Sequence, residues 1–174
     1  LNDRVKAEID TERRRAIVSN HSATHLMHSA LRNILGEHVQ QKGSLVNEEK
    51  LRFDFSHKQK LTESEILKVE QEVNQAISSA KDTQIIETSI EESQKLGAIA
   101  FFGEKYGEQV RVLKIAGDYS TELCGGTHVK NSSEIKSFKI ISETSISSGV
   151  RRIEAISGDL AIKDKDDNKI DLIN

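Results

Sequence analysis

Residues 20–36 read NHSATHLMHSALRNILG and contain the clearest helical pattern near the N-terminus. Asn20 or Ser19 can cap the first turn of such a helix, and Gly36 is typical of a helix end. The apolar positions recur every three or four residues, as on one face of an α-helix: Ala23, Leu26, Met27, Ala30, Leu31, Ile34 and Leu35. The pattern predicts an amphipathic helix over residues 20–36, with its apolar face toward a core.

The rest of the chain mixes strand and helix patterns without a repeating strand–helix–strand order. Thr62 and Glu65 form a capping box, which predicts a helix that runs to Ala80. Apolar residues on both sides of a polar turn predict a β-hairpin over residues 43–55. The fold class we expect is α+β, with a largely antiparallel sheet and packed helices. Further strands are expected at residues 5–9, 83–88, 110–115, 138–141 and 150–156. A helical turn is expected at 11–15, a short helix at 91–96, and a loop or a frayed end at 164–169.

The composition is that of a globular domain. Of the 174 residues, 36% are hydrophobic and 30% charged, and the mean hydropathy is −0.51. No apolar run approaches the ~20 residues of a membrane span, and no signal peptide is recognisable. A single cysteine excludes an internal disulfide and fits a reducing, cytoplasmic location. Because the sequence begins with Leu1 rather than Met, we expect it to be a piece of a longer protein.

The net charge of −3 is the sum of unlike segments. Residues 61–110 carry six more acidic than basic residues, whereas residues 1–60 and 111–157 have basic excesses of three and two. A local basic surface can bind phosphate groups even when the total charge is negative. Charge alone favours the simpler interpretation of a mixed, solvated surface.

Three histidines lie on one face of the predicted helix. At about 100° per residue, His21, His25 and His28 fall in one arc with Arg32, opposite the apolar stripe. Two histidines on successive turns can hold one metal ion, and the spacing permits either His21 with His25 or His25 with His28. An exposed polar face without a metal is the alternative interpretation.

The only cysteine lies in the segment CGGTH, residues 124–128, where two glycines and a threonine separate a thiol from an imidazole. Glycine permits a tight or positive-φ backbone, so both side chains can turn toward one point. Two helix histidines with Cys124 and His128 form a donor set suited to Zn²⁺. A buried, unreactive cysteine is the competing interpretation.

These two motifs, NHSATHL at residues 20–26 and CGGTH at 124–128, resemble the editing domain of the alanyl-tRNA synthetase family. Further matching motifs follow in order over residues 5–157: QKGS at 41–44, LRFDFSH at 51–57, FGEKYG at 102–107 and SGVRRIE at 148–154. Threonyl-tRNA synthetases share the histidine and cysteine spacing, but their cysteine motif resembles CRGPH rather than CGGTH.

The resemblance implies the threonyl/alanyl-tRNA synthetase editing-domain fold over residues 1–158, followed by a C-terminal extension over residues 159–174. It implies hydrolysis of mischarged Ser-tRNA(Ala) and Gly-tRNA(Ala), a proofreading step of protein biosynthesis. It assigns one Zn²⁺ to His21, His25, Cys124 and His128, in preference to His28. The parent enzyme would also use ATP and Mg²⁺, in an aminoacylation domain upstream of this segment. A zinc-bound water is the expected nucleophile, with a zinc ion that only orients the substrate as the alternative, and no side-chain base is assigned.

Three alternatives stay open. A free-standing trans-editing deacylase would perform the same chemistry. A non-catalytic tRNA-binding module with a structural zinc would suit the four protein ligands, because structural zinc sites have complete sets of four. A threonyl-type editing domain is disfavoured by the residues between Cys124 and His128.

Two residues are candidates for distinguishing serine from alanine, Thr24 and Gln41. A site that hydrogen-bonds the serine hydroxyl rejects alanine, because its own polar group would be left unpaired. The alternative for Thr24 is a hydroxyl bonded to its own helix backbone, and for Gln41 a solvated strand residue.

Basic residues near the motifs are candidates for the phosphates of the tRNA(Ala) acceptor end: Lys42, Arg151 and Arg152. Arg151 and Arg152 are neighbours on a predicted strand, so one of them should point away from the other. Glu104 and Tyr106 are expected in a glycine-flanked loop, which is either near the site or only a turn. His38 and His57 receive no role from the sequence, and the run of arginines at residues 13–15 is interpreted as surface.

Overall fold

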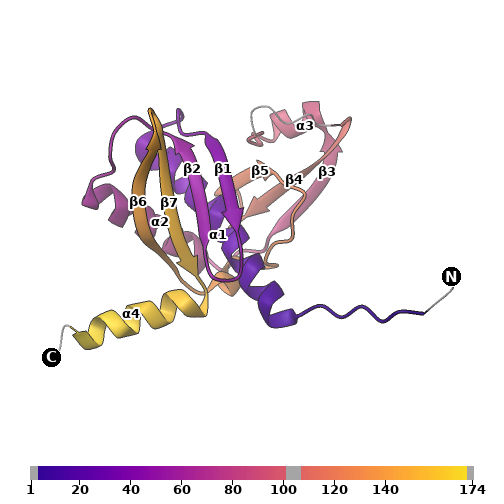
Figure 1. Cartoon of the computed structure of the whole chain (residues 1–174). Coiled ribbons are helices and arrows are strands. Elements are labelled where there is room, and N and C mark those ends of the chain that lie inside the picture. The colour runs from indigo at the N-terminus through magenta and orange to yellow at the C-terminus, as the bar shows by residue number, and fades with distance from the viewer. Residues whose placement is uncertain (1–3, 101–106, 172–174) are drawn as a thin grey trace.

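The computed structural model describes residues 4–100 and 107–171, with side chains up to residue 167. Its central element is the helix α1 (Thr11–Leu35), which has a β-sheet on either side (Figure 1). The larger sheet has the order β1 (Gln41–Val46), β2 (Leu51–Ser56), β7 (Val150–Ser157) and β6 (Phe138–Ser147). The smaller sheet has the order β3 (Gln84–Ser89), β4 (Gln109–Ile115) and β5 (Ser120–Leu123). All the strand pairs in these two sheets are antiparallel, which confirms the predicted α+β class.

Helix α1 begins earlier than the sequence predicted. The carboxylate of Asp10 accepts a hydrogen bond from the Arg13 N–H at 3.0 Å and caps the helix, and Gly36, with φ of 116°, ends it. Residues 19 and 20 therefore lie inside the helix, and the prediction that one of them caps it is wrong. The predicted strand at 5–9 is also wrong, because residues 4–10 form no regular secondary structure.

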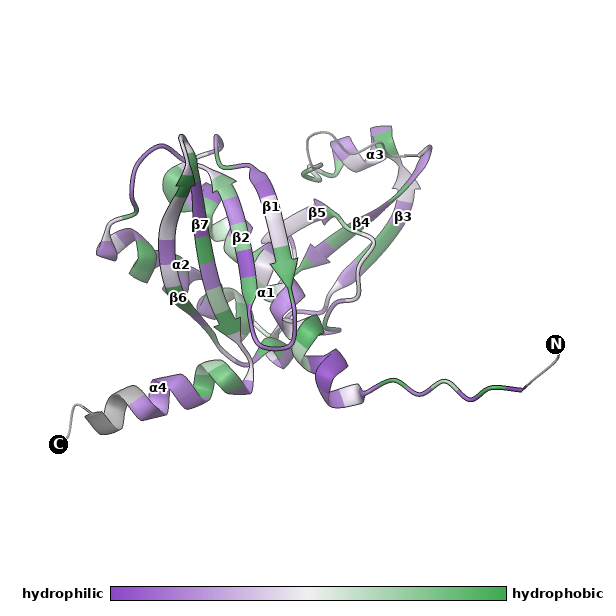
Figure 2. Cartoon of the chain, viewed as in Figure 1, coloured by the Kyte–Doolittle hydropathy of each residue, from purple (hydrophilic) through white to green (hydrophobic). Residues whose placement is uncertain are grey.

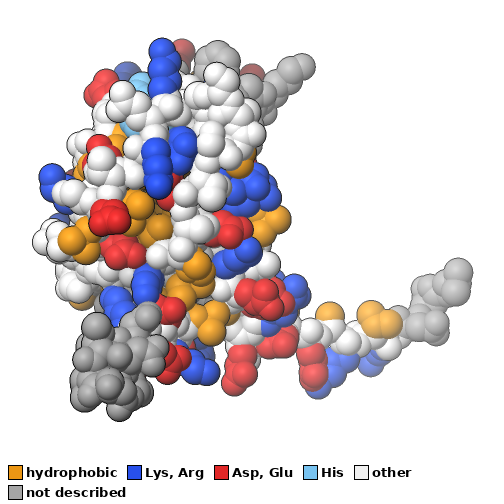
Figure 3. All heavy atoms as spheres, turned by 60° about the vertical axis from the view of Figure 1, so that its left-hand side comes forward, with side chains coloured by type: hydrophobic (Ala, Val, Ile, Leu, Met, Phe, Trp, Pro, Cys, Tyr) orange, Lys and Arg blue, Asp and Glu red, His pale blue; other side chains and the backbone are white. Residues whose placement is uncertain are grey.

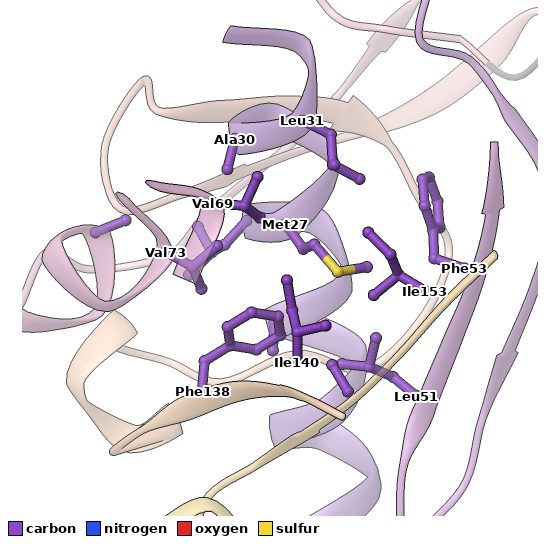
Figure 4. Packing of buried hydrophobic residues seen from close by; sticks show 14 of the residues in the cluster. Met27, Ala30, Leu31, Leu51, Phe53, Val69, Val73, Phe138, Ile140 and Ile153 are labelled. Carbon is purple, nitrogen blue, oxygen red and sulfur yellow. The ribbon is translucent and has the colours of Figure 1, made fainter. Parts of the chain in front are cut away.

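The main core lies between the larger sheet and two helices, α1 and α2 (Glu63–Ser78). Figure 4 shows side chains from both helices and the sheet meeting there. Strand β7 alternates between buried and partly buried residues, and Figure 2 shows both hydrophobic and hydrophilic residues along it. The alternation is one of burial rather than of hydropathy, because Arg151 is buried whereas Val150 is only partly buried. The labelled side chains of Figure 4 that are fully buried are Met27, Ala30, Leu31, Leu51, Phe53, Val69, Val73, Phe138 and Ile153.

Local sequence signals place the elements around this core. The predicted capping box of α2 is confirmed, since the Thr62 N–H donates to Glu65 Oε2 at 2.7 Å and the Glu65 N–H to Thr62 Oγ1 at 3.2 Å. The predicted hairpin is confirmed as β1 and β2. The short helix appears as α3 (Ile90–Lys95), whereas β5 and the 3₁₀ helix η1 (Ser132–Ile135) were not predicted.

The C-terminal segment is helical rather than a loop. Helix α4 (Asp159–Asp171) includes residues 164–169, so the predicted loop is wrong. Ala161 is fully buried, Lys165 Nζ donates to Ser137 Oγ at 2.8 Å, and Lys139 pairs with Asp164. These contacts attach the first half of α4 to the larger sheet, while Figure 1 shows the rest projecting from the body.

The molecular surface carries both signs of charge. In the face that Figure 3 brings forward, basic and acidic side chains are interspersed rather than separated into fields. This arrangement agrees with the mixed, solvated surface that the charge pattern favoured. Among the described residues, no helix has both the length and the apolar character that crossing a membrane requires.

Candidate metal centre

Four potential metal ligands meet between α1 and the segment that follows β5. His21 and His25 come from successive turns of α1, and Cys124 and His128 from the CGGTH segment. Each offers one ligand atom, and these atoms all lie within 4.8 Å of one another. The spacing on the helix left two histidine pairs open, and the structure groups His21 with His25 while His28 lies outside the group. The four residues are called the metal cluster below.

The backbone of the CGGTH segment is held in place by Arg111 of β4. One nitrogen of its guanidinium, Nη1, donates to the carbonyl of Cys124 at 2.8 Å and to that of Gly126 at 2.7 Å. The N–H of Gly126 points to Cys124 Sγ at 3.4 Å, so the loop also stabilises the sulfur. Sequence reasoning gave Arg111 no role, because it precedes Cys124 by 13 residues on another strand.

Only one of the two glycines is required by the geometry of the loop. A Cβ added to Gly126 would lie 2.2 Å from His21 Cε1, whereas a Cβ on Gly125 would meet nothing within 4 Å. Neither glycine has a positive φ. Gly126 is therefore needed for the close approach of the loop to His21 and not, as the sequence also allowed, for an unusual backbone angle.

Ser22 joins the two halves of the cluster. Its hydroxyl oxygen accepts a hydrogen bond from the Val129 N–H at 3.1 Å and lies 3.5 Å from His128 Nδ1. Ser22 is fully buried and lies on α1 next to His21. This serine fixes the loop against the helix, and sequence reasoning missed it because small buried serines give no distinctive signal.

The surroundings of Cys124 and His128 favour the protonation states in which these two side chains bind metals. Burial would raise the pKa of Cys124, but hydrogen bonds from His128 and His21 and the charge of the nearby His25 outweigh it and lower the pKa to about 3. Burial lowers the pKa of His128 to about 4. A thiolate and a neutral imidazole are the ligating forms of these side chains.

Glu122 of β5 orients one of the ligands. This fully buried carboxylate accepts from Nδ1 of His25 at 2.6 Å and from Nδ1 of His28 at 2.8 Å. Burial would raise the pKa of Glu122, but the charge of His25 and the two hydrogen bonds hold it below its usual value. Burial would lower the pKa of His25, whereas Glu122 and Cys124 together raise it. An ionised carboxylate can only accept hydrogen bonds, so Nδ1 of His25 and Nδ1 of His28 each carry a hydrogen atom.

This arrangement leaves Nε2 of His25 available to the cluster. The atom is buried and has no hydrogen-bond partner among the residues that the structure describes. An imidazole whose Nδ1–H is held by a carboxylate is the usual arrangement of a metal-binding histidine. Glu122 was missed from the sequence, although its position two residues before Cys124, in a strand, places both on one side of the chain.

Replacement of Glu122 by glutamine is expected to weaken metal binding about 10- to 100-fold, because an amide cannot accept from both Nδ1–H groups as the carboxylate does. A competition titration of zinc against a chromogenic chelator measures the affinity. The control is Glu87→Gln, which makes the same change on an exposed position of β3. Equal zinc affinity of the two variants would show that Glu122 does not orient the ligand.

The other candidate residues are not among the four ligands of the metal cluster. Thr24 is buried, and its hydroxyl donates to the Asn20 carbonyl at 2.8 Å, as the simpler interpretation held. Gln41 opens β1 and is half-buried, and the next residue, Lys42, is exposed. Glu104 and Tyr106 lie outside the described residues.

The two predicted phosphate-binding arginines already pair with carboxylates of the larger sheet. They face opposite sides of β7, as the strand alternation predicts, with Arg151 buried. Arg151 pairs with the buried Glu143, and Arg152 donates to both oxygens of Asp54 at 2.7 and 2.9 Å. Their contact with tRNA stays a prediction, and a phosphate would have to compete with these partners.

Comparison with known proteins shows which families this chain resembles. Residues 110–154, which include Cys124 and His128, match the model of the threonyl and alanyl tRNA synthetase second additional domain. The alanine–tRNA ligase of Alkaliphilus metalliredigens is 58% identical over 91% of this chain and 18% of its own length. That of Idiomarina loihiensis is 55% identical over 94% of this chain and 19% of its own length.

A third relative agrees with these two. The alanine–tRNA ligase of Stenotrophomonas maltophilia is 53% identical over 93% of this chain and 18% of its own length. The chain thus spans about a fifth of the length of the curated relatives that it matches. Its two antiparallel sheets and packed helices form the editing-domain fold of the threonyl and alanyl enzymes. The chain is therefore similar, over more than nine tenths of its own length, to one segment of alanine–tRNA ligases.

Proposed function

We propose that this chain is the editing domain of an alanine–tRNA ligase and hydrolyses the ester of mischarged Ser-tRNA(Ala) and Gly-tRNA(Ala) in the cytoplasm. The observation that carries the proposal is the metal cluster, in which a second-additional-domain loop meets two histidines of α1. The relatives' name supports tRNA as the partner, and an editing site would receive its aminoacylated acceptor end.

The residues of the cluster fit zinc. One thiolate and three imidazoles suit a borderline-soft ion with tetrahedral preference. The buried Nε2 of His25, which has no partner among the described residues, and the close approach of Gly126 to His21 support an ion at this cluster. When bound, zinc would supply Lewis acidity and a fixed point for orienting the ester carbonyl.

The chain itself would position the substrate. An aminoacyl ester is already labile, so holding it in one orientation accounts for much of the rate enhancement that hydrolysis needs. We propose that Lys42 and Arg152 contact acceptor-end phosphates and that Arg151, through Glu143, holds the strand beneath them. Thr24 and Gln41 stay candidates for binding the serine hydroxyl. The Thr24 oxygen can still accept a hydrogen bond while its hydrogen is donated to Asn20.

The decisive experiment measures deacylation of Ser-tRNA(Ala), Gly-tRNA(Ala) and Ala-tRNA(Ala) by the purified chain, with zinc determined on the same sample. We expect rapid loss of the serine and glycine esters, retention of the alanine ester and about one zinc per chain.

A second function is favoured by the completeness of the ligand set. Four protein donors are typical of structural zinc sites, so a non-catalytic tRNA-binding module would carry the same cluster. It would bind zinc and tRNA but cleave neither ester. A second test inserts this segment into a full-length relative in place of the corresponding segment. If the resulting protein also cleaves neither ester, the non-catalytic module is favoured over the editing domain.

A further inference from the structure

Arg32, near the C-terminal end of α1, is half-buried and has no acidic partner among the described residues. One nitrogen of its guanidinium, Nη1, donates to the carbonyls of Glu37 and Val39 at 2.9 Å each. The other two nitrogens, Nε and Nη2, have no partner in the part of the chain that the structure describes, and both remain accessible to solvent. A cation that is partly removed from water and lacks a carboxylate favours the binding of an anion.

The free side of this guanidinium distinguishes Arg32 from the arginines of β7. Arg152 uses Nε and Nη2 to bind both oxygens of Asp54, at 2.7 and 2.9 Å. Arg32 presents the same two nitrogens without a carboxylate, while its two carbonyl contacts hold the group through Nη1. This pair of adjacent donors matches two oxygens of a phosphate group as well as those of a carboxylate. A phosphate at Arg32 therefore displaces no ion pair among the described residues.

Arg32 lines a cavity that is bounded by α1, by β5 and by the segment that follows α3. Its volume is about 290 Å³, and Ser29 and Thr121 are among its polar lining residues. Asp118 is the acidic residue in the lining, and its carboxylate is already paired with Lys114 at 2.7 Å. A cavity of this size has room for a phosphate group and part of the sugar attached to it.

Two neighbouring elements lead from the metal cluster to this cavity, since β5 runs beside α1 (Figure 1). On α1, Arg32 follows His25 by about two turns, which keeps it on the same face and about 10 Å away along the axis. On β5, Thr121 precedes Cys124 by about 10 Å of extended chain. In an aminoacyl-tRNA a single ribose separates the ester from the terminal phosphate. An ester at the cluster therefore places this phosphate within reach of a long side chain at Arg32.

We infer that Arg32 binds the terminal phosphodiester of the tRNA acceptor end through Nε and Nη2. This inference rests on the proposed function, because it requires an aminoacyl ester at the metal cluster. The contact is remote from the reacting carbonyl and is the same for every aminoacyl group. Arg32 therefore adds affinity for the acceptor end and gives no discrimination between serine and alanine. The competing role is structural, in which the two carbonyl contacts only hold the turn after α1.

Two substitutions of Arg32 separate its charge from its paired donors. Arg32→Gln removes both, while its amide can still donate to one carbonyl of the turn after α1. Arg32→Lys retains the charge but not the two adjacent donors. The control is Arg14→Gln, which makes the same chemical change at an exposed position near the other end of α1.

The probes are two non-hydrolysable analogues of the substrate. One is adenosine with serine in 3′-amide linkage, and the other is the same molecule with a methyl phosphodiester at its 5′ position. Calorimetry on the zinc-loaded chain measures both affinities, and their ratio isolates the phosphate contact. We expect the native chain and Arg14→Gln to bind the phosphodiester about tenfold more tightly than the nucleoside. In Arg32→Gln the two affinities should agree within about twofold, and Arg32→Lys should give an intermediate ratio. The affinity for the nucleoside and the zinc content should be the same in all four proteins.

Three results would overturn the inference. The native chain could bind neither analogue, or bind both equally, or keep its preference for the phosphodiester in Arg32→Gln. Equal weakening of both analogues by Arg32→Gln would show the structural role instead, and this result also overturns the inference.

Deacylation of Ser-tRNA(Ala) by the same preparations keeps this inference separate from the proposed function. If the native chain cleaves the ester but shows no preference for the phosphodiester, the proposed function holds and the assignment of Arg32 fails. If it cleaves no ester but shows a preference that Arg32→Gln removes, the proposed hydrolysis fails and the assignment of Arg32 holds.

Discussion

Replacement of Cys124 by alanine is expected to remove zinc and ester hydrolysis together. Cys124 is the only cysteine of the chain, and its Sγ lies 3.3 Å from His128 Nε2 and 3.6 Å from His21 Nε2. The substitution removes the negative charge of the donor set and leaves three imidazoles around the site. We expect zinc to be absent from the purified protein and deacylation of Ser-tRNA(Ala) to fall by more than about 100-fold.

Metal analysis and single-turnover deacylation on one preparation measure both effects. The fold should survive, because the side chain of Cys124 lies on a loop beyond β5 and only borders the main core. Cys124→Ser keeps the shape of the side chain but offers a poorer metal ligand. Its zinc content and its deacylation rate should therefore lie between those of Cys124→Ala and of the native protein. His38→Gln, which changes a residue outside the cluster, should retain both zinc and activity. A zinc-free Cys124→Ala protein that hydrolyses the serine ester at the native rate would exclude a role of the metal in catalysis.

Local signals explain why much of the fold was predictable from the sequence. The capping box at Thr62 and Glu65 is complete within four residues, and the hairpin of β1 and β2 needs only its own turn. The start of α1 was not predictable in this way. Asn20 has the chemistry of a cap, but its side chain donates to the Asn47 carbonyl and accepts from Ser157, which is 137 residues away. A polar residue that serves a distant strand looks the same in the sequence as one that caps a helix.

Distance along the chain also limited what the sequence showed of the candidate site. The shared face of three histidines was visible from their spacing, yet His25 and His28 were expected on a polar face and are both buried. Their burial depends on Glu122, which is 97 and 94 residues away. The same limit applies to the tail, where the charges of residues 164–169 indicated a loop. Ala161 at the start of α4 is buried, and residues 164–169 lie in that helix.

Replacement of Gly126 by alanine is expected to break the metal cluster without unfolding the chain. The added Cβ would lie 2.2 Å from Cε1 and 2.8 Å from Nδ1 of His21, and 3.4 Å from Nε2 of His128. Carbon atoms do not approach so closely, so either the loop moves away from α1 or the His21 ring turns out of the cluster. Both movements separate ligand atoms that now lie within 4.8 Å of one another. We expect zinc affinity to fall by about 100-fold or more, because one of four ligands is lost.

Gly125→Ala is the matched control, since it makes the same chemical change at the neighbouring residue, where a Cβ would meet nothing within 4 Å. Its backbone φ is not positive, so alanine introduces no strain there. In a competition titration, the zinc affinity of Gly125→Ala should be close to that of the native chain, and the zinc affinity of Gly126→Ala should be far lower. The two metal-free variants should have equal thermal stability. Equal zinc affinity would mean that the loop relaxes around the new methyl group, because the two variants differ only in which side of the loop the methyl group occupies. The close approach of Gly126 to His21 would then be incidental to the metal cluster and not a requirement of it.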